Sequence, residues 1–224
     1  MKRTIATIGF WSALVAFVGA LGYVASVLLQ ILDVVSPIHD AFIAFASSLV
    51  IATPFLIAMV ALHHTVPEEK RFWTHAAVML AVIYTTYCTL NYVVQLVTVL
   101  PAGYSWTFEN QQGTAGPLSL LNQTPHSLFW DIDGLGYVFM NLATLFAFPV
   151  FEKRGLQGWV RGFFLANGLI TPLFAITYFY PGYSMPILLL GGIPWAITVP
   201  ACLLSLALFF KSQNQPVTKR AAPG

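Results

Sequence analysis

The side chains best suited to chemistry lie at the start of one apolar segment, PHSLFWDIDGLGYVFMN at residues 125–141, whose hydrophobic run continues to residue 151. Successive residues of an α-helix are rotated by about 100°, so a helix that begins here is predicted to carry one polar face. That face contains His126, Asp133, Tyr137 and Asn141, while Asp131 points nearly opposite. Ionisable groups within a membrane-spanning helix are costly and usually face a protein interior or a water-filled cavity. Asp133 is therefore the leading candidate for a functional group, with His126 and Tyr137 among its candidate partners.

Polar side chains at helical spacing also occur in three other apolar segments. Asn91 and Asp133 are each predicted to lie about 12 Å from the same end of their helices, at 1.5 Å per residue, whereas the other half of the bundle is apolar. We therefore expect a pocket that opens on one side rather than a continuous pore, with Asn91 and Gln95 facing Asp133 or Asn141. The candidate ligand-binding residues are Asp133, His126, Tyr137, Asn141, Asn91, Gln95, Gln30 and Asn167. The alternative is that the amide side chains bind no ligand and only form hydrogen bonds that hold neighbouring helices together.

The composition indicates a polytopic helical membrane protein. Of the 224 residues, 58% are hydrophobic and only 8% are charged, whereas soluble domains carry about 25% charged residues. A membrane-spanning helix needs about 20 apolar residues, and six runs are long enough: 8–32, 38–62, 72–100, 126–151, 157–180 and 185–210. In the fourth run, Thr124 and Pro125 are predicted to supply the N-cap and the first helical residue.

We thus expect an all-α fold in which residues 1–211 form a single bundle of six transmembrane helices. Residues 212–224 are polar and include two prolines, which predicts a disordered cytoplasmic tail.

The basic residues predict how this bundle is oriented. All ten Lys and Arg residues fall at the chain ends or near the two connections on one side of the six spans, a partition that an odd number of spans would break. Because positive charge collects on the cytoplasmic side, both termini are predicted to be cytoplasmic, in a plasma (inner) membrane. The opposite, outer side carries a long connection at 101–124 between the third and fourth helices. Long loops in compact proteins often serve as lids or binding loops, so we expect this one to lie over the mouth of the pocket.

Several kinds of site have no counterpart in the sequence. Cys88 and Cys202 lie in apolar runs, and no Cys or His spacing matches a zinc site. No nucleophile elbow, metalloprotease motif or phosphate-binding loop occurs. We therefore expect no metal, no cofactor and no nucleic-acid partner, and the lipid bilayer as the surrounding partner. The oligomeric state does not follow from the sequence.

Three functions are compatible with these features. The first is binding or transport of a small or amphipathic ligand in a polar pocket between helices. The second is an intramembrane enzyme that acts on a lipid-like substrate, with Asp133 and His126 as an acid–base pair. The third is a structural or partner-binding membrane subunit without a ligand. The sequence does not decide whether the protein is an enzyme.

Overall fold

The computed structural model describes residues 2–103 and 120–214, and within them it contains helices but no strands. Within these described residues, six helices are long and apolar enough to cross a membrane, which confirms the predicted number of candidate spans and supports an integral multi-pass membrane protein. The predicted connection at 101–124 is described only at its two ends, and residues 215–224 of the predicted tail lie outside the described residues.

The first three spans are α1 (Lys2–Ile31), α2 (Pro37–Thr65) and α3 (Arg71–Val94). A short 3-10 turn at Glu68–Lys70 precedes α3, and a π-helical turn at Gln95–Val99 and a 3-10 turn at Leu100–Ala102 extend it. The fourth span is α4 (Leu128–Ala147) with a 3-10 turn at Phe148–Val150. The fifth is divided into α5 (Gly155–Leu169) and α6 (Thr171–Phe179), and the sixth is α7 (Met185–Gln213).

The start of α4 differs from the prediction. Ser127, rather than Thr124, is the N-cap, and its Oγ accepts a hydrogen bond from the Trp130 backbone N–H at 3.1 Å. His126 precedes the helix with φ at 66°, a left-handed conformation that a helix cannot contain. The prediction that His126 belongs to the α4 polar face is therefore wrong, because the helix begins two residues after it.

The division of the fifth span has a local cause. Pro172 has no backbone N–H, so the carbonyl four residues earlier, on Gly168, loses its helical partner. The Thr171 hydroxyl replaces that partner and donates to the Gly168 carbonyl at 2.6 Å. Beyond the break, α6 packs against both α4 and α7.

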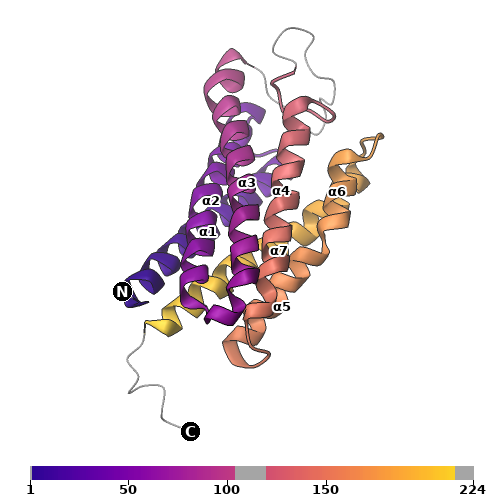
Figure 1. Cartoon of the computed structure of the whole chain (residues 1–224). Helices are drawn as coiled ribbons and strands as arrows, with labels where there is room; N and C mark the ends of the chain where they lie inside the picture. Colours follow the sequence, from indigo (N-terminus) through magenta and orange to yellow (C-terminus); the bar gives the residue numbers. More distant parts are fainter. Residues whose placement is uncertain (1, 104–119, 215–224) are drawn as a thin grey trace.

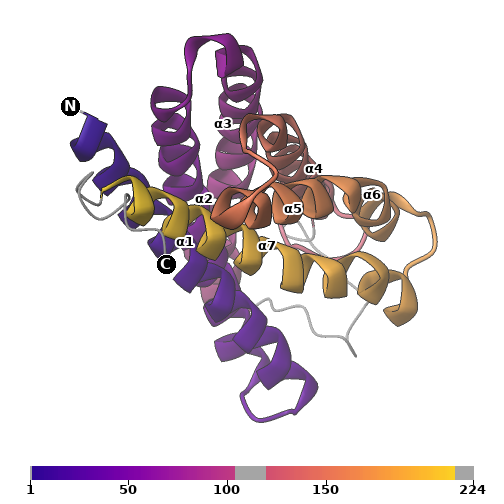
Figure 2. The ribbon, with the colours of Figure 1, turned by 90° about the horizontal axis from the view of Figure 1, so that it is seen from below.

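Figures 1 and 2 show how the helices are arranged: α1 lies along α2, α3 lies along α4, and α7 packs against α1 and α5. Glycines permit the closest approaches. A Cβ on Gly19 would lie 2.9 Å from the Ser47 carbonyl oxygen of α2, and one on Gly9 would lie 2.7 Å from the Phe210 ring of α7. Helices α1 and α7 therefore touch near the chain termini, and they diverge from there toward the other end of the bundle (Figure 2).

One end of the bundle gathers both ends of the described chain and two of the connections. Asn214 donates to Thr7 at 3.3 Å, which brings the end of α7 beside the start of α1. Lys70 donates to the Val150 carbonyl at 2.9 Å and so joins the α2–α3 connection to the α4–α5 connection. Arg161 donates to the carbonyls of Phe148 and Phe151 at 3.3 and 3.1 Å. We call this the terminal end and the opposite one the distal end.

Candidate functional site

Asp133 lies in the distal half of α4, is 2% exposed, and makes three side-chain hydrogen bonds. Its Oδ1 accepts from Asn91 Nδ2 of α3 at 2.9 Å. Its Oδ2 accepts from Gln123 Nε2 at 2.8 Å and from the Tyr178 hydroxyl of α6 at 2.9 Å. Two helices and one loop residue therefore converge on a single carboxyl group.

Gln123 is held in place by α3. Gln95 Nε2 donates to the Leu121 carbonyl at 2.6 Å, and Gln95 Oε1 accepts from the Gln123 backbone N–H at 3.3 Å. Asn91 Nδ2 also donates to Gln123 Oε1 at 3.0 Å. Gln95 is the first residue of the π-helical turn, a backbone irregularity that is frequent at functional sites. These hydrogen bonds thus hold the segment that leads into α4 against α3, on the distal side of Asp133.

The partners of Asp133 are all neutral donors: two amide N–H groups and one phenol O–H. Donors of this kind match the oxygens of an ionised carboxylate. They supply no positive charge, and a buried charge without a counter-charge is costly. Among the described residues, no Lys or Arg lines the space around Asp133.

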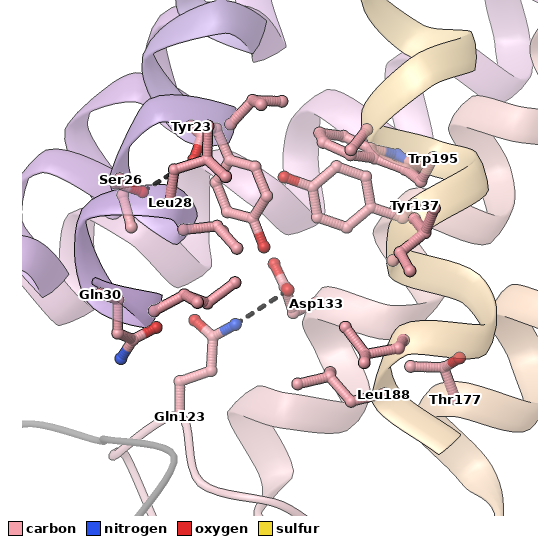
Figure 3. Close-up of a pocket in the computed structure, with 18 of the residues that line it drawn as sticks. Tyr23, Ser26, Leu28, Gln30, Gln123, Asp133, Tyr137, Thr177, Leu188 and Trp195 are labelled. Carbon is pink, nitrogen blue, oxygen red and sulfur yellow. Dashed lines mark hydrogen bonds between the residues drawn. The ribbon is translucent and has the colours of Figure 1, made fainter. Parts of the chain in front are cut away.

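A cavity of about 320 Å³ adjoins the carboxyl group. It is bordered by α1, α2, α4, α6 and α7, with one residue from α3 and one from the loop. Its polar lining residues are Tyr23, Ser26, Gln30, Asp40, Tyr92, Gln123, Trp130, Asp133, Tyr137, Thr177, Tyr178 and Trp195. Figure 3 shows Gln123 bonded to Asp133 and the hydroxyl of Tyr23 pointing toward Asp133 from α1. The remaining lining side chains are apolar, so the cavity has largely hydrophobic walls. The region where Asp133, Gln123, Tyr178 and Tyr23 meet is what we call its polar end.

Aromatic rings surround the polar end. The ring of Trp195 lies edge-on to Tyr137 and to Tyr23, with centroid separations of 5.1 and 5.2 Å. On the other side, Trp130 and Tyr178 have centroids 4.7 Å apart, and the Trp130 indole N–H donates to the Tyr178 carbonyl at 3.1 Å. The Tyr137 and Tyr92 hydroxyls share a hydrogen bond of 2.7 Å. These contacts fix the rings that border the space beside Asp133.

The cavity reaches the lateral surface of the bundle between α1 and α7. Its lining residues there are exposed: Ile31 of α1 is 58% exposed, and Ile197 of α7 is 64% exposed. This is the side on which α1 and α7 diverge (Figure 2). In a spanning bundle such apolar surface faces hydrocarbon, so the mouth opens toward lipid rather than along the bundle axis.

The residues predicted from the sequence divide into three groups. Asp133, Tyr137 and Gln30 line the cavity. Asn91 and Gln95 lie behind Asp133, fully buried, which confirms that Asn91 faces Asp133 across the interior rather than lipid. The third group consists of His126, Asn141 and Asn167, none of which is among the residues that line the cavity.

His126 is exposed and lies outside α4, so the predicted pairing of His126 with Asp133 along one helical face does not occur. Asn141 and Asn167 instead bond to each other: Asn167 Nδ2 donates to Asn141 Oδ1 at 3.1 Å. Both are fully buried. They belong to a second polar cluster nearer the terminal end.

Sequence reasoning missed several residues that border the cavity. Tyr178 belongs to the polar face of the fifth span, and its spacing was a usable signal. Asp40 lies in the first turn of α2, where an acidic residue is common, yet it is 4% exposed and lines the cavity. Gln123 lies in an irregular segment where no periodicity could have indicated it.

In the part of the chain that the structure describes, no group of three or more His, Cys, Asp or Glu side chains lies close enough together to hold a metal ion. A helical bundle by itself is compatible with many activities, so the function depends on the side chains of the site. The chain matches no protein-family model, and searches of curated proteins and of solved structures find no match either.

Proposed function

We propose that the protein binds an amphipathic, lipid-like ligand in the cavity between α1, α2, α4, α6 and α7. The observation that carries the proposal is the form of the cavity: hydrophobic walls, one buried polar end at Asp133, and a mouth between α1 and α7. An amphiphile has the same division between chain and head group. A ligand already dissolved in the bilayer can enter sideways without crossing water.

The volume supports a ligand-sized site. Small-molecule pockets usually measure about 300–1,000 Å³ and combine apolar walls with a few fixed polar groups. The cavity, at about 320 Å³, falls at the lower end of this range. It suits one hydrocarbon chain or a compact head group better than a complete two-chain lipid.

The enzyme alternative has less support. It requires a second group within hydrogen-bond reach of the atom on which Asp133 acts. His126 was the expected second group, and it lies outside α4 with an exposed side chain. The contacts of Asp133 with Asn91, Gln123 and Tyr178 are those of a fixed acceptor.

Native mass spectrometry of the protein purified in a mild detergent tests the proposal. We expect a co-purified amphiphile, and we expect Gly192→Phe to lower its occupancy at least tenfold. Gly192 lines the cavity, and a Cβ there meets no atom within 4 Å, so the new ring has room to fill the site.

Gly162→Phe is the matched control, because Gly162 of α5 also has open space around a Cβ but does not line the cavity. The proposal fails if the wild-type protein carries no amphiphile, or if Gly192→Phe retains as much as Gly162→Phe.

We also propose that the six spans form one domain in a plasma membrane with both termini cytoplasmic. The one-sided distribution of the ten Lys and Arg residues supports this orientation. Cys88 and Cys202 are buried, so a cysteine introduced at Gln112 can be labelled against a low background. This cysteine should react with an impermeant reagent in intact cells. Labelling only after permeabilisation would contradict the proposed orientation.

A further inference from the structure

We propose that the ligand is an amphipathic cation whose ammonium group binds beside Asp133 and Asp40, against the aromatic rings. This inference rests on the proposed function and specifies the chemical class of the ligand. Three observations support it: the charges that line the cavity, a buried carboxylate oxygen without a partner, and the rings at the polar end.

The charges that line the cavity all have one sign. Asp133 of α4 and Asp40 of α2 both border it, and among the described residues no Lys, Arg or His does. The described basic side chains at Lys70 and Arg161 instead bond to carbonyls at the terminal end. A cation entering the cavity therefore meets two acidic side chains and no competing positive charge. An anion would be repelled by both carboxylates and would find no positive side chain to balance it.

Asp40 supplies the second observation. It is 4% exposed, and its Oδ1 has no hydrogen-bond partner. A buried polar atom left without a partner costs about 1–3 kcal/mol. Asp133, by contrast, has its oxygens occupied by three neutral donors. Asp40 thus offers a free acceptor, and Asp133 offers charge that no protein cation balances.

The aromatic rings favour an alkylated ammonium group. A cation is attracted to the face of a Trp or Tyr ring within about 6 Å of its centroid, and such rings commonly recognise quaternary ammonium ligands. Tyr23, Tyr137 and Trp195 form one group of rings with centroid separations of 5.1 to 5.2 Å. Trp130, Tyr178 and Phe174 form another, with separations of 4.7 and 5.1 Å. The rings contact the alkyl groups of such a cation, and the carboxylates balance its charge.

Amphiphiles with the same decyl chain and different head groups test the inference on the full-length protein in a neutral detergent. The probes are decyltrimethylammonium, decyl maltoside and decyl sulfate, each titrated by native mass spectrometry. We expect the cation to bind at least tenfold more tightly than the neutral probe, and the sulfate to bind least. Equal or tighter binding of the neutral probe or the sulfate would overturn the inference.

Variants assign the effect to the carboxylates. Asp133→Asn should weaken binding of the cation at least tenfold and Asp40→Asn at least fivefold, and each should change binding of decyl maltoside less than twofold. Asp131→Asn is the control, because Asp131 does not line the cavity. If Asp133→Asn does not fold, Asp40→Asn still decides, since Asp40 Oδ1 has no hydrogen bond to lose. Unchanged cation binding in Asp40→Asn would contradict its role.

The same experiment separates this inference from the proposed function. If the two probes bind the wild-type protein equally and Gly192→Phe abolishes binding of both, the cavity binds amphiphiles but has no preference for a cation. If Gly192→Phe affects neither probe, the proposed function itself fails. Decylphosphocholine distinguishes two sources of the ammonium group. Binding as tight as that of decyltrimethylammonium would indicate that the ammonium group belongs to a phospholipid head group. Much weaker binding would indicate an alkylammonium ion that carries no phosphate.

Discussion

Two polar clusters are buried in this bundle, and they differ in what they adjoin. The distal cluster joins Asn91, Gln123, Asp133 and Tyr178 and borders the cavity. The inner cluster, nearer the terminal end, joins Asn141, Thr144, Asn167 and Thr198. Its hydrogen bonds connect α4, α5 and α7, and none of its members lines the cavity.

The contrast shows why polar residues in a spanning helix are weak evidence for a site when considered singly. The inner cluster uses the same amide and hydroxyl groups as the distal one, but its donors and acceptors mostly satisfy one another. Interhelical hydrogen bonds of that kind contribute about 0.6 kcal/mol on average. The distal cluster differs in containing a carboxyl group and in leaving one side open to a cavity. The combination of ionisable group and cavity is what distinguishes a candidate site from helix packing.

The largest effect should come from Asp133→Asn. We expect ligand binding to fall tenfold or more, which corresponds to at least about 1.4 kcal/mol. The substitution also replaces an acceptor oxygen with an N–H₂ group that faces the donors of Gln123 or Asn91, so the unfolding free energy should decrease by about 1–3 kcal/mol. Ligand occupancy by native mass spectrometry and a thermal melt in detergent measure the two effects.

Asp131→Asn provides the comparison for this prediction. Asp131 is adjacent in sequence, half-buried, and absent from the cavity lining. Both binding and stability should stay near wild type. A loss of binding in Asp131→Asn with retention in Asp133→Asn would contradict the assignment of the site to Asp133.

Asn167→Ala should affect stability without affecting binding. It removes the donor to the buried Asn141 and Thr144 of α4 and one acceptor of the half-buried Thr198 of α7. We expect a loss of about 1–2 kcal/mol, between the average interhelical bond and the cost of an unsatisfied buried group. Reversible unfolding in mixed micelles measures it. A tenfold fall in ligand occupancy would show that the inner cluster is part of the site.

Tyr178→Phe should destabilise the protein least among the three substitutions that remove a buried hydrogen bond. It removes one of three hydrogen bonds to Asp133 and keeps the ring that stacks with Phe174 and lies 4.7 Å from Trp130. Stability should decrease by about 1 kcal/mol, the usual net contribution of one hydrogen bond. Ligand binding should change less than threefold, because charge and aromatic surface are both retained. Binding lost as severely as in Asp133→Asn would mean that the hydroxyl itself contacts the ligand.

Much of the architecture followed from the sequence because the relevant signals are local. Runs of about 20 apolar residues are required by the thickness of the bilayer, so the number of spans could be counted. The cost of burying Asp133 marked it as unusual before any neighbour was known. The helical spacing of Asn91 and Gln95 correctly predicted a polar face turned toward the interior.

The tertiary structure alone decided which polar residues meet. The N-cap at Ser127 begins α4 after His126, and the break at Pro172 lets α6 present Tyr178 to Asp133. The loop residue Gln123 reaches the same carboxyl group without any periodic signal. Most faces of these helices are apolar and pack about equally well in hydrocarbon, so periodicity cannot predict how each helix is rotated against its neighbours. The divergence of α1 and α7 opens the cavity sideways. The angle at which two helices cross is set by side-chain packing between them, and not by the pattern within either helix.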